Sequence, residues 1–263
     1  MNSQDRKIFT RLCALGVLCA CLWHFSGKAS TQNRAQAGSQ IPISTQQLPT
    51  TNGKVAVELK CGDAELSAPD KIENFPCSVV NNTNKRISAM SVAYSITVED
   101  GGGESSHTEA LTLDTFIHPD LREERKDNLI KPRAERPFRP LPTSFGDAVV
   151  KAISMHVDYV EFEDNSSLGP NESGSRIIGD IREGAAKYST WLMGKYNSSG
   201  KSVSAMTSLI QDDPLPEGEL GIKSAAQEQG AVIYRNFLRD SYETKGLEHL
   251  AKFLERKASS EKK

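Results

Sequence analysis

The sequence predicts an α+β protein in two units, an antiparallel immunoglobulin-like β-sandwich followed by a small all-α domain of two duplicated helical hairpins. Across residues 54–169, apolar residues alternate with polar ones, which is the period of a half-buried strand. From residue 174 onward they recur every three or four positions, the period of an amphipathic helix. This helical part also repeats itself at an offset of 46 residues.

Composition and charge narrow the class of protein. The chain has 263 residues, of which 37% are hydrophobic and 25% charged, as in an ordinary globular protein rather than a fibrous or wholly disordered one. Its 32 basic and 34 acidic residues give a formal net charge of −2. A chain so close to neutral is not built to bind nucleic acid through bulk electrostatics, so we expect no nucleic-acid partner.

The N-terminal segment, residues 1–29, predicts export. A basic start precedes an apolar run at residues 12–23, which is shorter than the roughly twenty residues of a membrane-spanning helix. Cleavage after Ala29 would release the protein. Two alternatives stay open: lipidation of Cys21, which ends a lipobox-like stretch, or retention of the segment as an N-terminal anchor. The protein is then periplasmic, secreted, or attached to the membrane through this segment alone.

Residues 30–53 are rich in Ser, Thr, Gln, Gly and Pro and show no apolar period. A segment of this composition buries too little surface to offset its conformational entropy. We therefore expect a flexible linker here, between the signal and the β-sandwich domain at residues 54–169.

Only two of the five cysteines, Cys61 and Cys77, fall in the folded part of the chain. An even pair in an exported protein predicts a disulfide. Two buried free thiols are the alternative.

The strands of the first unit are read from the alternation. The clearest strand, at residues 88–98, puts five residues on one face: Met90, Val92, Tyr94, Ile96 and Val98. Glycines 101–103 end it, and Leu111 and Leu113 mark a returning strand, as in a hairpin. A later strand carries Ile153, Met155, Val157 and Tyr159 on one face, and then its register slips to Val160 and Phe162. That slip predicts a β-bulge.

Residues 149–170 (VVKAISMHVDYVEFEDNSSLGP) resemble the closing strand and turn of uncharacterised exported bacterial proteins with an immunoglobulin-like β-sandwich. The resemblance is confined to this segment. It implies export and the fold of the first unit, and it implies no activity and no functional residue.

The helical domain, residues 174–257, contains two similar segments at residues 183–210 and 229–254. In the first helix of each copy six positions are identical, namely Gly184/Gly230, Ala185/Ala231, Tyr188/Tyr234, Leu192/Leu238, Tyr196/Tyr242 and Gly200/Gly246. Each copy predicts a helix that ends at a glycine and a shorter helix that packs back. The small Gly-Ala pairs predict that the two first helices approach each other closely.

No arrangement of residues predicts a catalytic site, a metal site or a cofactor. Ser105, Ser106 and His107 fall in a hairpin, where a solvated turn explains them better than a nucleophile and its base. In residues 119–140 basic residues, Arg125 and Arg136 among them, are interleaved with acidic ones, which is typical of a solvated loop or edge.

We therefore expect a non-catalytic exported or envelope-attached protein that serves as a scaffold for an unknown protein partner, an expectation by analogy of fold. The interaction surface is predicted beside Tyr196 and Tyr242. The alternatives are a module that binds a small ligand or a carbohydrate, and a hydrolase whose site is built from the scattered carboxylates of Asp158, Glu161 and Glu163.

Overall fold

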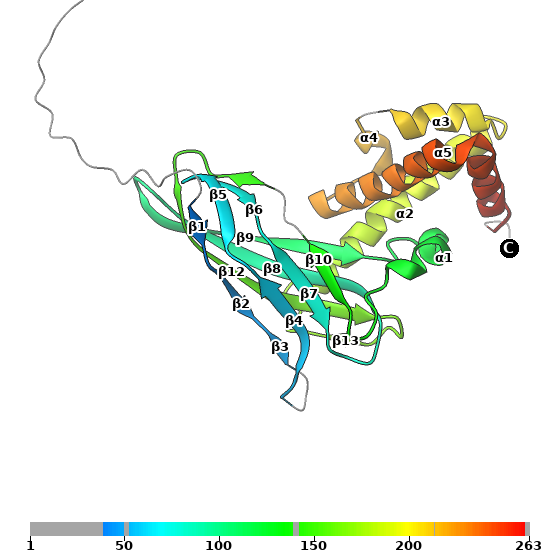
Figure 1. Ribbon diagram of the computed structural model, residues 1–263. Coiled ribbons are helices and arrows are strands. Elements are labelled where there is room, and N and C mark those ends of the chain that lie inside the picture. The colour runs from blue at the N-terminus through cyan, green and yellow to red at the C-terminus, as the bar shows by residue number, and fades with distance from the viewer. Residues whose placement is uncertain (1–38, 50–52, 139–141, 213, 261–263) are drawn as a thin grey trace, which may run out of the picture. The chain divides into compact units, whose positions relative to one another are not determined.

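The computed structural model describes residues 39–49, 53–138, 142–212 and 214–260 (Figure 1). The predicted export signal, with Cys21, and the first residues of the predicted linker lie outside this part. As predicted, the protein is α+β, with antiparallel sheets followed by a C-terminal helical region. None of the described helices is long and apolar enough to cross a membrane.

The largest sheet has the order β13-β12-β8-β9, and β2 pairs with β12 as well. All of its pairs are antiparallel except β2 with β12. Its strands are β2 (Ile43–Gln46), β8 (Ile87–Asp100), β9 (Gly103–Asp114), β12 (Val149–Phe162) and β13 (Ser167–Leu168).

Two smaller sheets pair β1-β5-β6-β11 and β10-β7-β4-β3. The strands of the first are β1 (Gln40–Ile41), β5 (Ala64–Ala68), β6 (Lys71–Asn74) and β11 (Thr143–Ser144). Those of the second are β3 (Leu48–Pro49), β4 (Val55–Cys61), β7 (Cys77–Asn81) and β10 (Glu135–Phe138). All three sheets contribute side chains to one apolar core.

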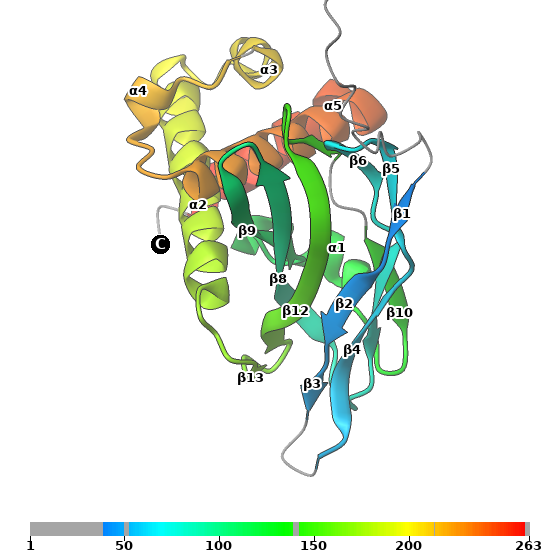
Figure 2. The same cartoon turned by 90° about the vertical axis from the view of Figure 1, so that its left-hand side faces the viewer.

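The predicted alternation in β8 is confirmed, and the strand is buried on both of its faces. Met90, Val92 and Tyr94 point into the core between the sheets, whereas Ser91 lies on the opposite face beside the start of α2 (Gly174–Ser198). Figure 2 shows α2 along one side of the β9-β8-β12 layer, with β4 of the smaller sheet on the other side.

The predicted bulge in β12 is also confirmed, and it has a structural role. Val157 pairs with Val92 and Tyr159 with Ser91, so Asp158 is the extra residue. The bulge turns the Asp158 carboxylate toward α2, where it accepts backbone hydrogen bonds from Glu172 (2.7 Å), Ser173 (3.1 Å) and Gly174 (2.6 Å). These are N–H groups at a helix start, which need acceptors and favour negative charge.

The bulge also corrects the expectation for Tyr159. Tyr159 does not share the core face of Ile153, Met155 and Val157, because the extra residue moves it to the side of α2. Val160 returns to the core.

The expectation of a flexible linker is wrong for residues 40–49. They form β1, β2 and β3, which pair with β5, β12 and β4. Ile41 and Ile43 pack against the core between the sheets, and Leu48 is buried in it. A few well-placed apolar residues and a free strand edge thus outweigh the polar composition of the segment.

The helical region has its own apolar core, which also takes up Ile117 and Leu121 from the connection between β9 and β10. That connection contains the short helix α1 (Arg122–Arg125) between two turns of 3₁₀ helix, η1 (Pro119–Leu121) and η2 (Lys126–Asn128). The remaining helices are α3 (Val203–Gln211), α4 (Glu217–Leu220) and α5 (Ala225–Ser260). Gly246, with φ 81° and ψ 178°, divides α5 into two helical stretches.

Helices α2 and α5 meet at Gly184 and Gly230, and their contacts are reciprocal. A Cβ atom on Gly184 would lie 1.8 Å from the carbonyl oxygen of Gln227, and one on Gly230 would lie 1.8 Å from that of Ile181. Gly184 and Gly230, and likewise Ile181 and Gln227, are equivalent positions of the repeat. Helices α2 and α5 therefore contact each other through residues at corresponding positions of the sequence repeat.

The equivalent tyrosines of the sequence repeat, Tyr188 of α2 and Tyr234 of α5, lie close to each other. Their ring centroids are 6.2 Å apart, and both side chains are buried. The repeated aromatic residues therefore hold the two copies together.

Candidate binding cleft

The largest sheet leaves the outer edge of its long strand β9 open among the described residues. On one side β2 pairs with β12, and the chain runs on into β3, which pairs with β4 of a smaller sheet. On the other side β9 pairs only with β8 among the described residues. From Gly103 to Glu109 every residue of β9 is exposed.

Next to this open edge, two adjoining cavities form what we call the β9–β10 cleft. They share Thr112, Leu113 and Arg136. The end of β9 leads from here into α1, next to β10 (Figure 1). In the described chain no strand connects the edge of β9 to that of β10.

The first cavity is apolar and has a volume of about 150 Å³. It lies between the largest sheet and the β10-β7-β4-β3 sheet. Its apolar walls are Val79, Met90, Val92, Leu111, Leu113 and Phe138. An apolar side chain of another chain that entered this cavity would be surrounded by apolar side chains, as in the core of the protein.

The second cavity, of about 210 Å³, is cationic. Arg125 of α1 and Arg136 of β10 both line it, as do Ile181 of α2 and Ile233 of α5. Arg136 Nη1 donates to the backbone oxygen of Asn128 at 3.1 Å. Arg125 Nη1 is buried and has no hydrogen-bond partner among the described residues. A buried donor without an acceptor is costly and rare in native proteins.

The acid that lines this second cavity, Asp114, is already engaged. Arg182 of α2 donates to both of its oxygens, through Nε at 2.7 Å and Nη2 at 3.2 Å. The same guanidinium also binds both oxygens of Glu161, at 3.0 and 2.8 Å. Burial lowers the pKa of Arg125. The negative charge of Asp114 raises this pKa in part, and the positive charge of Arg136 lowers it further. Arg125 and Arg136 therefore line the same cavity, and little negative charge in it is left to balance their positive charges.

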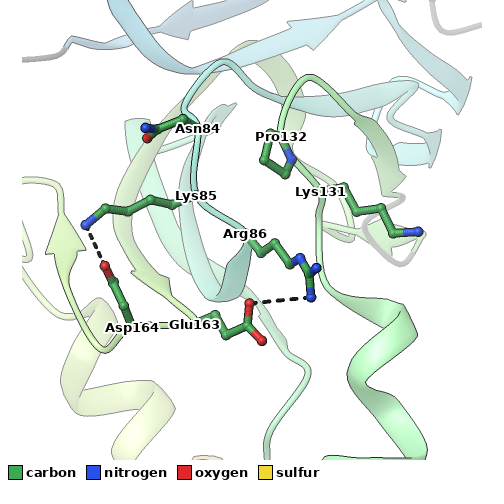
Figure 3. Close-up of a pocket in the computed structure, with 7 residues that line it drawn as sticks. All are labelled: Asn84, Lys85, Arg86, Lys131, Pro132, Glu163 and Asp164. Carbon is green, nitrogen blue, oxygen red and sulfur yellow. Dashed lines mark ion pairs between the residues drawn. The ribbon is translucent and has the colours of Figure 1, made fainter.

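A larger groove, of about 760 Å³, lies on the surface formed by the β7–β8 turn, the loop before β10 and the β12–β13 turn (Figure 3). Its charges pair with each other: Lys85 Nζ lies 2.7 Å from Asp164, and Arg86 lies 3.6 Å from Glu163. The hydrogen bonds from Lys85 and Ser166 lower the pKa of Asp164 to about 2. Exposed ion pairs of this kind contribute little energy. We therefore interpret this groove as ordinary solvated surface. The β9–β10 cleft is the stronger candidate for a binding site.

The predicted disulfide is confirmed. Cys61 and Cys77 are bonded and lie directly opposite each other in the β4–β7 pair. The Met155 sulfur packs against them, 3.6 Å from Cys77 Sγ. The bond therefore links two strands of the core.

The predicted surface beside Tyr196 and Tyr242 is not formed as expected. Tyr196 is 1% exposed and belongs to the helical core, so it cannot line an interaction surface. Tyr242 is half-buried against the same core. These tyrosines recur in the repeat because they pack the helices.

The three carboxylates considered for a hydrolase serve separate structural roles. Asp158 is buried and caps α2, Glu161 pairs with Arg182, and Glu163 lies in the surface groove. Ser105, Ser106 and His107 are spread along exposed positions of β9. Within the described ranges, no three His, Cys, Asp or Glu side chains gather closely enough to hold a metal ion.

Sequence reasoning missed Arg125 and Arg136 as lining residues of a cavity, because it assigned them to a solvated loop or edge. Their neighbours in the chain are charged, so nothing local indicates burial. The apolar residues Leu121, Leu129 and Ile130, all buried, were the available signal that this connection packs against the protein.

No protein-family model matches this chain, and no curated protein is significantly similar to it.

Proposed function

We propose that the protein is an exported, non-catalytic binding module that takes up an extended segment of a partner protein along β9. The observation that carries the proposal is the open edge of β9, where the described chain offers no pairing strand. An unpaired edge can hydrogen-bond to an added strand, and this is a common mode of peptide recognition. Pockets beside the edge then select side chains, and the β9–β10 cleft supplies such pockets.

Edge strands are also a risk, because they can pair with the wrong chain. In β9 the exposed stretch contains Glu104 and Glu109, and charged residues of this kind discourage indiscriminate pairing. The edge is therefore suited to a partner whose side chains match the cleft, rather than to any extended chain.

We also propose that the three sheets represent an immunoglobulin-like sandwich, residues 54–169, to which the N-terminal strands are added. The proposed helical domain, residues 174–257, consists of two duplicated hairpins that cover one face of this sandwich. The reciprocal contacts of Gly184 and Gly230 support the duplication.

Export and attachment to the cell envelope belong to the proposal as well. The Cys61–Cys77 disulfide supports them, because disulfides persist mainly in oxidising compartments. The resemblance of residues 149–170 to exported bacterial proteins points the same way. Among the described residues no aromatic side chain is fully exposed, so the carbohydrate-binding alternative gains no support from them.

Site-specific photo-crosslinking in the native cell envelope tests the proposal. Thr108 of β9, Ser95, Ser154 and Ser44 of β2 lie in one row across the sheet. Thr108 and Ser44 are both exposed, at opposite ends of that row. A photoreactive residue in place of Thr108 should crosslink to a partner protein, and the same residue in place of Ser44 should not. Equal crosslinking at both positions, or none at Thr108, would contradict the proposal.

A further inference from the structure

We infer that the partner segment carries an acidic residue and an apolar residue at adjacent positions, and that the β9–β10 cleft binds both. The carboxylate enters the cationic cavity beside Arg125 and Arg136, and the apolar side chain enters the adjoining cavity. This inference rests on the proposed function and names the chemistry of the partner.

The charge balance of the cationic cavity favours an anion. Asp114 is the one acid among the described lining residues, and both of its oxygens accept hydrogen bonds from Arg182. Arg136 has a backbone partner at Asn128, whereas Arg125 Nη1 is buried without one. A carboxylate is the group that guanidinium forks bind best in proteins without modification. It would supply the acceptor that Arg125 lacks.

The spacing follows from strand geometry. The apolar cavity reaches from Leu111 to Leu113 of β9, and the cationic cavity from Thr112 to Ile117. The two share Thr112, Leu113 and Arg136 at the edge of the sheet. Leu111 and Leu113, opposite Val92 and Met90, face the core, whereas Asp114 faces α2 and bonds with Arg182, so the cavities open on opposite faces of β9. In a strand laid beside β9, side chains at adjacent positions point to opposite faces. One such pair would place its members in neighbouring cavities.

The sizes of the cavities agree with single side chains. The apolar cavity, about 150 Å³, suits a Leu or Val, and the cationic one, about 210 Å³, suits an Asp or Glu with ordered water. The cleft therefore recognises a short local pattern.

Capped fluorescent peptides of alternating Thr and Leu, with one Thr replaced by Asp, test the inference on the intact protein. Both orders of Leu and Asp are included, because the direction of pairing with β9 is open. The Asp peptide should bind about tenfold more tightly than its Asn twin, and high salt should weaken this preference. Replacing the neighbouring Leu by Ala should weaken binding as well.

Arg125→Met should abolish the preference for Asp over Asn, and it should raise the melting temperature, because it removes a half-buried guanidinium whose buried Nη1 has no acceptor. A variant that is more stable yet has lost the preference cannot owe the loss to misfolding. Arg122→Met is the matched control: Arg122 lies in the same short helix but is exposed, so this variant should keep the preference for Asp.

Two results would overturn the inference while leaving the proposed function intact. One is equal binding of the Asp and Asn peptides by a protein that still crosslinks its partner through Thr108. The other is displacement of the Asp peptide by inorganic phosphate at far lower concentration than by acetate, which would assign the cavity to phosphate. If Thr108 shows no position-specific crosslink, the proposed function itself fails.

Discussion

Gly184 and Gly230 are fixed as glycines by the backbone of the opposite helix. Their missing Cβ atoms would lie 1.8 Å from carbonyl oxygens, and neither backbone can move aside without separating α2 from α5. We expect Gly184→Ala and Gly230→Ala each to lower the free energy of unfolding by about 1–3 kcal/mol or more, as overpacking does. Urea denaturation measures the change.

Two other glycines of α2 provide the control for this prediction. No atom lies within 4 Å of a Cβ built on Gly179 or Gly194. Alanine there should therefore stabilise the helix by up to about 1 kcal/mol, since it replaces a poor helix former. If all four alanine variants behaved alike, the close approach of the two helices would be refuted.

Asp158 joins the largest sheet to α2 through a single carboxylate. Asp158→Ala leaves three backbone N–H groups near the helix start without their acceptor, and we expect a loss of about 2 kcal/mol of stability. Asp158→Asn keeps one acceptor oxygen and should lose less. Glu163→Ala, which removes an exposed carboxylate close by in the chain, should change stability little, and a comparable loss there would argue against the capping role.

At the scale of elements, the disulfide couples β4 to β7 where they pair. It closes a loop with a sequence separation of 16, and in the chain-entropy description such a loop is worth about 3 kcal/mol. We therefore expect the Cys61→Ala/Cys77→Ala double variant to unfold at lower urea concentration, by about this free energy. The intact protein with added reductant should approach the same value, and an unchanged midpoint would show that the bond is dispensable.

The connection between β9 and β10 is tied to α5 by Asp120. Its carboxylate bonds with Lys257 and accepts from Tyr234 at 3.1 Å, and His118 lies 3.2 Å away. Burial by itself would raise the pKa of Asp120, but the hydrogen bonds and charges of His118 and Lys257 hold it well below the usual value.

Because the folded-state pKa of Asp120 is depressed, its stabilising effect is complete above the unfolded-state value. It is lost as the pH falls from about 4 toward the folded-state pKa. We expect Asp120→Asn to be less stable than the wild type at neutral pH, and the difference to shrink below about pH 4. Denaturation curves across this range measure it; a difference independent of pH would show that the charge of Asp120 is not what matters.

At the scale of the whole molecule, the sequence reveals elements better than the surfaces between them. The alternation in β8, the bulge in β12, the disulfide and the repeated Gly-Ala pairs are local signals with one dominant physical cause each. The strands at residues 40–49 carry few apolar residues, and pairing with distant strands decides their structure. The β9–β10 cleft brings together β9, α1, β10, α2 and α5, so no local pattern could indicate it or the burial of Arg125.

The central claim, that a partner segment pairs with β9, is tested most directly by amide hydrogen exchange along β9 in the full chain, alone and crosslinked to its partner. Backbone N–H groups on the outer edge of Gly103–Glu109 have no strand partner among the described residues, so they should exchange rapidly in the free protein. In the complex we predict slow exchange at alternate residues of this stretch. A complex that left β9 unchanged and protected the helical region instead would contradict the account.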